Sequence, residues 1–439
     1  MPTPVDGTRA PVVGVREYGT AIVEGVTLSA ADRRLCAAPG LAERLTVREL
    51  AGGRLEITAY QHVGVVRLDA CEIRVRPKYL GEDLDVLRML AYANDGTCPP
   101  LDAHRTAADG APNLRDLVAL LVTEHAERLL GHGVRRDYVT SEDELPAVRG
   151  RLLVDRQVLR LYGRLDRLAC RFDDHDPDVL DNRLCAAATD LAARTTRDPA
   201  VRARARRAAA RFAALAPGPL GDLRTALAGL DYHRHNEHYR APHRWSALLL
   251  GGGGIADLFA AGPLASRAFL VDMNTLFESF TTRLLTEAAA GAGTTGYAVH
   301  DQSRQRGVLH DERTGTPYSE IRPDVLVTGP DLCLPVDVKY KLYEAGARGG
   351  KLSTADLYQA FLYAHALARQ PDGRMPTCVL VHPGGSSAPR ESVAVRRWDG
   401  GTSARVRSLP LDLPGVLREL DGPGRAGALR RVWDQLLPK

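Results

Sequence analysis

Hydrophobic and polar positions alternate with a period of two from residue 12 to about residue 80. Short β-branched runs recur there and are separated by Gly or Asp: VVGVREYG, GRLEITAYQ, HVGVVRLDA and CEIRVRPKY. This pattern predicts strands. The runs at 63–68 and 72–76, joined around Asp69-Ala70, predict a hairpin. With a helix expected at 84–93, residues 1–105 are interpreted as a β-rich N-terminal domain.

The spacing of apolar residues becomes helical after Asn113, which is placed to act as an N-cap. The apolar stripe consists of Leu114, Leu117, Leu120, Leu121, Leu129 and Leu130. It predicts a mainly helical middle region over 106–250. Within that region HGVRRDYVTSEDELPAVRGRLLV is expected to form a loop and then a strand. A second helix is expected from Leu180. Five arginines between 202 and 211 are interpreted as a solvated helix face rather than a DNA-binding patch.

A glycine run at 251–254 suggests a domain boundary near 245–268. Beyond it the pattern predicts a helix from Asn274, strands at 295–302, 321–328 and 332–342, a helix from Thr354, a strand at 375–383 and a final helix at 415–437. Residues 266–439 are therefore expected to form an αβββαβ core, a mixed sheet flanked by helices. The fold class predicted for the chain is α/β, with several domains.

Composition narrows the class of protein. The 439 residues are 44% hydrophobic and 26% charged, which is typical of globular chains. Neither a signal peptide nor a membrane-spanning run is predicted. Seven cysteines without a CxxC pair fit a reducing cytoplasm. The net charge of +4 does not indicate DNA binding by itself.

Candidate chemistry lies on two of the predicted strands. Asp337 and Lys339 share one face of a strand and lie about 7 Å apart along the backbone. Pro323-Asp324 lies on the preceding strand, so pairing of the two strands would bring Asp324 close to Asp337. Two carboxylates with a nearby ammonium form a site for a hard cation such as Mg²⁺. The lysine could orient or activate a water molecule there.

The motif is short, and an exposed strand with an ordinary ion pair is the alternative interpretation. The dipeptide Pro-Asp occurs four times, at 177–178, 323–324, 330–331 and 371–372. Lysine is scarce, however, since only Lys78, Lys339, Lys341, Lys351 and Lys439 occur among 58 basic residues. That scarcity makes a chance match uncommon. Glu278 on the preceding predicted helix and Gln359 on the following one add polar groups to the same core.

These residues resemble the motif of the PD-(D/E)xK nucleases, the fold of many restriction endonucleases. The resemblance implies that Asp324, Asp337 and the Val338 carbonyl hold Mg²⁺, with Mn²⁺ as an alternative. It implies that Lys339 orients the attacking water. Glu278 resembles an acid of the first helix that assists metal binding, and Gln359 resembles a polar residue of the helix after the motif.

A wider set of segments resembles the McrC family, the nuclease subunits of McrBC restriction systems that depend on modified cytosine. The segments are GVREYG, ITAYQHVGVVRLDACEIRVRPKY, LLGHGVRRDY, VRGRLLV, RFDDHDPDVLDNRLC, LFESF, RPDVLV, VDVKYK and DLYQAFLYA. The resemblance implies an McrB-type hexameric AAA+ GTPase as partner, contacted and stimulated by the N-terminal domain. It also implies double-stranded, methylated DNA as substrate, recognised by the partner.

The chain has no nucleotide-binding loop of its own, because the nearest candidate, Gly350-Lys351, lacks the flanking Gly and Ser/Thr. Arg76 and Lys78 are candidates for the ring contact, and a structural role for them is equally favoured. Two other functions stay open. One is an activator or adaptor of the GTPase with a weak or vestigial nuclease, and the other is a stand-alone nuclease.

Two further clusters are interpreted structurally. His233, His235, His238 and His243 match no common zinc spacing, which favours a polar loop or helix face. The Asp-rich segment 173–178 lacks the Gly and Glu of a calcium loop. We expect it to cap the helix that begins near Leu180.

Overall fold

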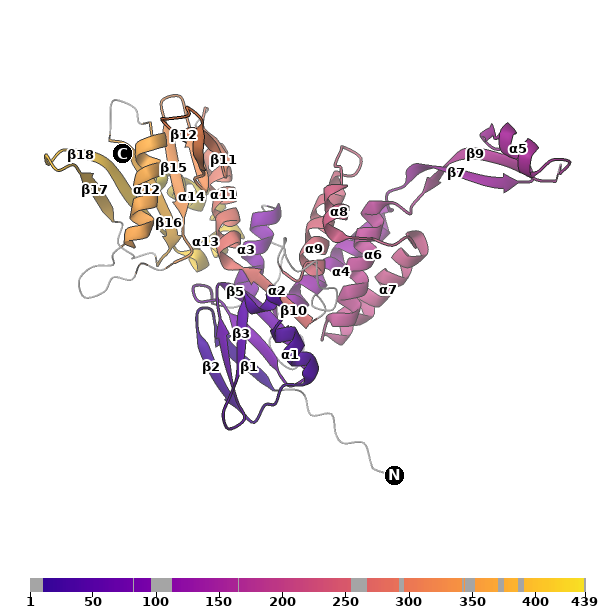
Figure 1. Ribbon diagram of the computed structural model, residues 1–439, viewed down its shortest axis with the longest axis horizontal. Helices are drawn as coiled ribbons and strands as arrows, with labels where there is room; N and C mark the ends of the chain where they lie inside the picture. The colour runs from indigo at the N-terminus through magenta and orange to yellow at the C-terminus, as the bar shows by residue number, and fades with distance from the viewer. Residues whose placement is uncertain are drawn as a thin grey trace. The chain divides into compact units, whose positions relative to one another are not determined.

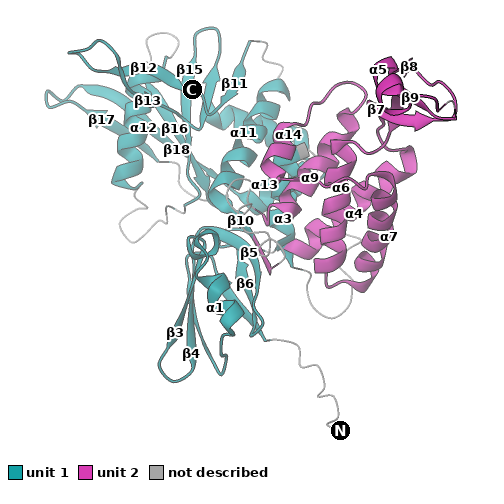
Figure 2. Cartoon of the chain, turned by 45° about the vertical axis from the view of Figure 1, so that its right-hand side comes forward, with its two compact units in different colours: residues 1–114, 270–439 teal, residues 115–269 magenta. Residues whose placement is uncertain are grey.

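The computed structural model describes residues 11–81, 83–95, 113–164, 166–253, 267–291, 296–341, 343, 352–369, 375–385 and 391–437. The chain divides into two compact units (Figure 2). One unit comprises residues 1–114 and 270–439, and the other comprises residues 115–269. The first unit is thus built from both ends of the chain. The expected division into domains at 1–105, 106–250 and 266–439 stays a prediction.

The β-rich part of the first unit contains two sheets, with strand orders β1-β6-β5-β10 and β2-β4-β3. Its elements are β1 Val12–Arg16, β2 Thr20–Glu24, α1 Ala30–Cys36, α2 Pro39–Ala42, β3 Leu45–Leu50, β4 Arg54–Ala59, β5 His62–Arg67, β6 Glu72–Arg76 and α3 Asp83–Asp95. The antiparallel pairing of β5 with β6 confirms the predicted hairpin.

One strand of that sheet comes from the other half of the chain. β10, Ala268–Asp272, lies next to β5 and was not predicted, because its short apolar run AFLVD has no alternation. Helix α11, Met273–Gly291, follows β10 directly. The β-rich sheet and the C-terminal core are therefore continuous through residues 272 and 273.

The C-terminal core is a six-stranded sheet with strand order β11-β14-β15-β16-β18-β17. Its elements are β11 Ala298–Asp301, β14 Val325–Thr328, β15 Cys333–Val338, α12 Thr354–Leu367, β16 Thr377–Pro383, β17 Ser392–Arg396 and β18 Thr402–Leu411. The order α11, β11, β14, β15, α12, β16 confirms the predicted αβββαβ order. Helix α12 packs on β15, β16 and β18, and α11 packs on β11, α3 and α14.

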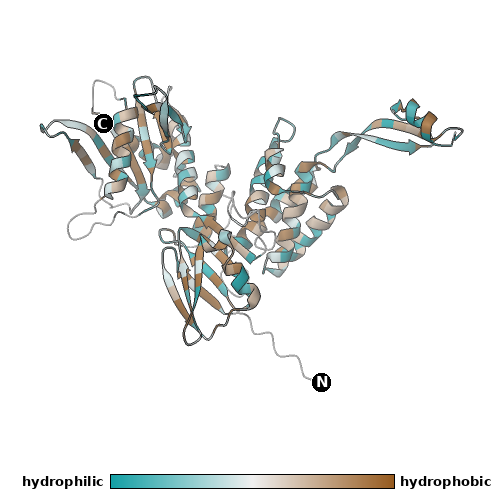
Figure 3. Cartoon of the chain, in the orientation of Figure 1, coloured by the Kyte–Doolittle hydropathy of each residue, from teal (hydrophilic) through white to brown (hydrophobic). Residues whose placement is uncertain are grey.

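Two details of this core differ from expectation. A separate hairpin, β12 Gln305–His310 and β13 Pro317–Ile321, lies between β11 and β14. Most of β13 is exposed, so no apolar alternation signalled it. The expected final helix at 415–437 is two helices, α13 Leu413–Leu420 and α14 Arg425–Leu436, separated at Gly422 and Gly424. Strand residues such as Val325, Val336 and Val379 are fully buried, and the central strands are predominantly apolar (Figure 3).

The second unit consists of a helical body and a projecting arm (Figure 1). The body contains α4 Leu114–His132, α6 Leu180–Thr195, α7 Pro199–Leu215, α8 Leu223–Ala228, a short 3-10 turn at Glu237–Tyr239 and α9 Arg240–Leu250. The arm, residues 137–176, contains β7 Asp137–Leu145, β8 Arg151–Leu152, α5 Val154–Arg160 and β9 Leu168–Asp176. Residues 137–145, expected to form a loop, pair with β9 along their whole length. Cross-strand pairs such as Thr140–Asp173 and Glu142–Arg171 replace the missing apolar alternation.

Candidate active site

Two aspartates predicted to converge lie side by side in the structure. β14 and β15 are antiparallel neighbours, and Val325 pairs with Val336. That register brings Asp324 opposite Asp337. Oδ2 of Asp324 accepts the Val338 N–H at 2.7 Å, so the first aspartate is fixed on the strand that carries the second. Pro323 precedes the strand proper, where its missing N–H costs no ladder bond.

Lys339 lies immediately after β15, and its side chain folds back toward Asp337. Its Nζ donates to Oδ1 of Asp337 at 3.0 Å, and its side chain is 19% exposed. The Lys339 N–H also donates to the Val381 carbonyl at 2.9 Å, which extends the pairing of β15 with β16. Burial lowers the pKa of Lys339, but the carboxylates of Asp337, Asp324 and Asp356 together outweigh burial, so the net shift is upward. Lys339 is therefore an ammonium at neutral pH.

Asp337 has the chemistry of an incomplete cation site. Its side chain is fully buried, and Oδ2 has no hydrogen-bond partner in the described part of the chain. Burial raises the pKa of Asp337, Asp324 adds to the rise, and Lys339 opposes it. A buried carboxylate oxygen without a partner is costly unless a proton or a cation satisfies it. The Asp324 and Asp337 carboxylates with the Val338 carbonyl are hard oxygen donors, so this donor set fits Mg²⁺ or Mn²⁺.

Glu278 lies in the second turn of α11 and contributes to the charge of this site. Burial raises its pKa to about 7, and the Asp324 carboxylate is the next largest cause. Lys339 opposes that rise. Among the described residues no group of three or more His, Cys, Asp or Glu side chains is arranged to hold a metal ion. The part of Glu278 in metal binding stays a proposal.

Gln359 reaches the site through a second residue. Its Nε2 donates to the Tyr363 hydroxyl at 3.0 Å, one helical turn further along α12. That hydroxyl donates to the Arg322 carbonyl at 2.9 Å, next to Pro323-Asp324. Gln359 itself is exposed. The two residues therefore connect α12 to the segment that carries Asp324.

Sequence reasoning missed Tyr363 and Asp301. Tyr363 follows Gln359 by four residues, and this spacing was a usable signal because such residues lie on the same helix face. Asp301 ends β11 opposite Val325, and the next N–H, of Gln302, donates to the Asp324 carbonyl at 2.8 Å. Burial raises the pKa of Asp301, and the Arg322 guanidinium opposes the rise. No local pattern distinguishes Asp301 from any other strand-end aspartate.

Comparison with known proteins identifies the family of this chain. A family model described as "McrBC 5-methylcytosine restriction system component" matches residues 57–383, more than half of the chain. The chain belongs to this family. The match confirms at family level the resemblance noted in the sequence.

One solved structure has a fold similar to that of this McrBC-family chain. A chain from a half-complex of the tetradecameric assembly of Thermococcus gammatolerans McrB AAA+ hexamers with bound McrC is 18% identical, with a TM-score of 0.64. The match covers 97% of this chain and 100% of that chain. A chain of the T. gammatolerans McrBC complex is 20% identical with a TM-score of 0.46, over 63% of this chain and 88% of that chain. No curated protein matches the sequence.

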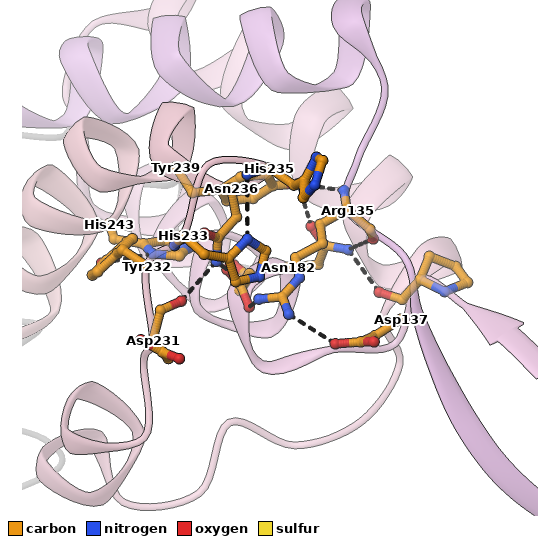
Figure 4. A network of polar contacts seen from close by, with 12 residues as sticks. Arg135, Asp137, Asn182, Asp231, Tyr232, His233, His235, Asn236, Tyr239 and His243 are labelled. Atoms are coloured by element: carbon orange, nitrogen blue, oxygen red, sulfur yellow. Dashed lines mark hydrogen bonds and ion pairs between the residues drawn. The ribbon is translucent and has the colours of Figure 1, made fainter.

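In this McrBC-family chain one residue of the histidine cluster, His243, has a structural role. His243 is 1% exposed, and both of its ring nitrogens are engaged, Nδ1 with the Tyr232 hydroxyl at 2.9 Å and Nε2 with the Asp181 carbonyl at 3.1 Å. The His233 N–H donates to Oδ1 of Asn236. These side chains belong to one polar network (Figure 4).

The same network holds the base of the arm. Arg135 Nη1 donates to Oδ2 of Asp181 at 2.8 Å, and Nη2 donates to Oδ2 of Asp137 at 2.7 Å (Figure 4). Asn182 donates to the Arg135 carbonyl at 2.8 Å and accepts the Tyr239 hydroxyl at 2.7 Å. Asn182 and Tyr239 are fully buried. The arm therefore begins at a set of hydrogen bonds that runs from the buried Asn182–Tyr239 pair to the exposed Asp137.

The Asp-rich segment 173–178 does not cap α6, which corrects the expectation. Residues 173–176 belong to β9, and the N-cap Val179 has no side-chain cap. Asp178 instead accepts from Arg183 at 2.6 Å and from the Gly218 N–H at 3.2 Å. Its role is to join the start of α6 to the loop after α7.

Gly350-Lys351, the nearest candidate for a nucleotide-binding loop, lies outside the described residues. No helix in the described part of the chain is long and apolar enough to cross a membrane. Arg76 and Lys78 are both exposed at the end of β6.

Proposed function

We propose that this chain is the nuclease subunit of an McrBC-type restriction system, a Mg²⁺-dependent DNA endonuclease with a core of the PD-(D/E)xK type. Asp324, Asp337 and Lys339 carry the proposal, because they converge at one end of β15. Membership in the McrBC family supports a role in restriction of DNA that contains modified cytosine. The buried, unpartnered Oδ2 of Asp337 supports metal binding.

Each residue has a defined part in this proposal. Asp324 and Asp337 provide carboxylate ligands, and the Val338 carbonyl provides a third oxygen. When bound, the metal would supply Lewis-acid stabilisation of charge on the scissile phosphate. Lys339, held at 3.0 Å from Asp337 as an ammonium, orients the attacking water and neutralises developing negative charge.

Two further side chains support the same site. Glu278, with its pKa near 7, can accept a proton near neutral pH, which places it to relay protons released as water attacks. Gln359 and Tyr363 fix the Arg322 carbonyl and so the approach of the chain to Asp324.

The partner that we propose is a hexameric AAA+ GTPase of the McrB type. The solved structure of similar fold contains McrB AAA+ hexamers with bound McrC. We propose methylated double-stranded DNA as substrate, with the mark read by the partner. The N-terminal domain, with Arg76 and Lys78, stays our predicted ring contact.

The arm offers a second surface for the partner. Its tip exposes large apolar side chains, with Leu159 82% and Tyr162 86% exposed. Val148, Val154 and Val158 are also exposed there, while the strands that carry the tip are largely hydrophilic (Figure 3). Apolar side chains gathered at the end of a polar projection indicate a binding surface. We propose that the arm tip contacts the GTPase.

Metal-dependent cleavage of methylated DNA, measured with the partner GTPase and GTP, tests the proposal. Cleavage by the wild type but not by Asp337→Ala is expected. Stimulation of the GTPase without any cleavage would favour an activator or adaptor with a vestigial nuclease. Equal cleavage without partner and nucleotide would favour a stand-alone nuclease.

A further inference from the structure

The end of the strand that precedes Lys339 is held by residues outside its own sheet. Tyr340 follows Lys339 and is 2% exposed. Its ring packs edge-on against Tyr79, with 5.0 Å between ring centroids, and lies 5.6 Å from the ring of Phe277. Tyr79 belongs to the segment after β6 of the β-rich sheet, and Phe277 directly precedes Glu278. The aromatic cluster thus touches the chain neighbours of two candidate site residues.

Glu17 lies behind this cluster, at the end of β1. It is 2% exposed, and its Oε2 accepts the Lys78 N–H at 3.1 Å. Its Oε1 and the Tyr340 hydroxyl are both buried, and neither makes a hydrogen bond of standard geometry with the described residues. Burial raises the pKa of Glu17 to about 8, and the Lys78 N–H and the Tyr340 hydroxyl oppose the rise. By accepting the Lys78 N–H, Glu17 fixes the segment of Lys78 and Tyr79, and the Tyr79 ring packs on Tyr340.

The β-rich sheet also holds the start of α11, the helix that carries Glu278. The Met273 N–H donates to the Gln61 carbonyl at 3.0 Å. Asp272 Oδ2, at the end of β10, lies 3.7 Å from Nε2 of His62 on β5. Two elements of the candidate active site are therefore anchored on one sheet that contributes no ligand to it.

We propose that Glu17 is a positioning residue for the nuclease: by holding the Lys78 N–H it places the Tyr79 ring against Tyr340 and so fixes the strand end that carries Lys339. Cleavage then requires the β-rich sheet, although that sheet does not touch the reacting atoms. The inference rests on the proposed nuclease function for the chemistry, but its structural part concerns only the placement of the Lys339 ammonium. Small displacements of a positioned group reduce catalysis steeply, because the reacting geometry is narrow.

Three variants of the full chain test the predicted effect of Glu17 on the cleavage rate. Cleavage is assayed with the partner GTPase, GTP, Mg²⁺ and methylated DNA. Glu17→Ala is expected to lower kcat by about 10-fold to 100-fold without changing KM. Glu17→Gln keeps an acceptor for the Lys78 N–H, so it is expected to restore most of the activity. Tyr340→Phe added to Glu17→Ala is expected to cost little more, because phenylalanine keeps the ring that packs on Tyr79 and Phe277.

Glu72→Ala is the matched control for loss of stability. Glu72 is a glutamate of the same sheet, 1% exposed, and it is paired with Arg67 and Arg74 rather than with β15. Equal losses of kcat in Glu17→Ala and Glu72→Ala, at matched thermal midpoints, would show a general stability effect and overturn the proposal.

A second measurement does not depend on cleavage. Because the chain has only five lysines, labelling of Lys339 by an amine-reactive reagent can be followed by mass spectrometry, with Lys439 as internal reference. Glu17→Ala is expected to label Lys339 several-fold faster than the wild type or Glu72→Ala. Unchanged labelling of Lys339 in Glu17→Ala overturns the proposal. If the wild type cleaves DNA, an unchanged kcat in Glu17→Ala overturns it as well. If Glu17→Ala labels faster but even the wild type never cleaves DNA, the positioning role is supported and the nuclease function is refuted.

Discussion

Asp337 and Lys339 form a buried pair in which only one carboxylate oxygen is satisfied. Nζ of Lys339 donates to Oδ1 at 3.0 Å, while Oδ2 has no partner among the described residues. A purely structural ion pair in this position would gain little, because burying charges costs about as much as their attraction returns. The half-satisfied carboxylate is instead what a cation site with an adjacent ammonium requires.

Replacing Lys339 should show how much the ammonium contributes to cleavage while the metal ligands are left in place. We expect Lys339→Ala to reduce cleavage by about 10²-fold to 10³-fold, the usual loss when one preorganised donor is removed. Lys341→Ala is the control, because that ammonium is 57% exposed and pairs with Asp356 at 3.2 Å. Single-turnover cleavage measures both. Equal losses in the two variants would contradict a specific role for Lys339.

Mg²⁺ should stabilise the folded chain more at pH 8 than at pH 6. Burial raises the pKa of Glu278 to about 7 and raises the pKa of Asp337 as well. A carboxyl with a raised folded-state pKa stabilises the fold below its unfolded pKa, and this stability is lost as pH rises through the folded value. Metal-free protein should therefore lose stability between about pH 4 and pH 7.

Because a cation competes with these protons, the midpoint shift that it causes should grow as the carboxyls ionise. Thermal unfolding with and without Mg²⁺ at pH 6 and pH 8 measures this shift, and Asp337→Asn should lose most of it. A shift that is independent of pH, or that persists in Asp337→Asn, would argue against this metal site.

The arm tip should be needed for stimulation of the GTPase but not for folding. Leu159→Asp combined with Tyr162→Asp is expected to abolish stimulation and to leave the thermal midpoint nearly unchanged, since exposed substitutions usually cost under about 0.5 kcal/mol. Tyr138→Asp, on β7 and 74% exposed, is the control and should stimulate normally. Full stimulation by the tip variant would exclude this surface.

The hydrogen-bond network at the base of the arm should contribute to the stability of the fold. Asn182→Ala leaves the buried Tyr239 hydroxyl without its acceptor and the Arg135 carbonyl without its donor. We expect a loss of about 1–3 kcal/mol in the free energy of unfolding. Denaturant unfolding measures that loss. A loss within experimental error would show that water or a rearranged partner satisfies the freed groups.

Sequence patterns predicted the C-terminal core well because its signals are local. The strands with Asp324 and Asp337 are short apolar runs on either side of a turn, so antiparallel pairing and the meeting of the aspartates follow from neighbouring residues. Lysine scarcity then made Lys339 stand out. The αβββαβ order could be predicted from the spacing of hydrophobic residues alone, which repeats every two residues in strands and every 3.6 residues in helices.

What the patterns missed depends on partners far away in the chain. β10 joins β5 across about two hundred residues, and nothing within AFLVD specifies that partner. The packing of Tyr79 on Tyr340 is of the same kind. β7 was missed for a different reason: both faces of the arm meet solvent, so its residues do not alternate in polarity.

The most direct measurement compares wild type with Asp337→Ala in two assays on the same preparation. The assays are Mg²⁺-dependent cleavage of methylated DNA and stimulation of the partner GTPase. The account predicts that Asp337→Ala loses cleavage completely and keeps assembly and stimulation at wild-type levels. An Asp337→Ala chain that still cuts DNA at the wild-type rate would contradict it.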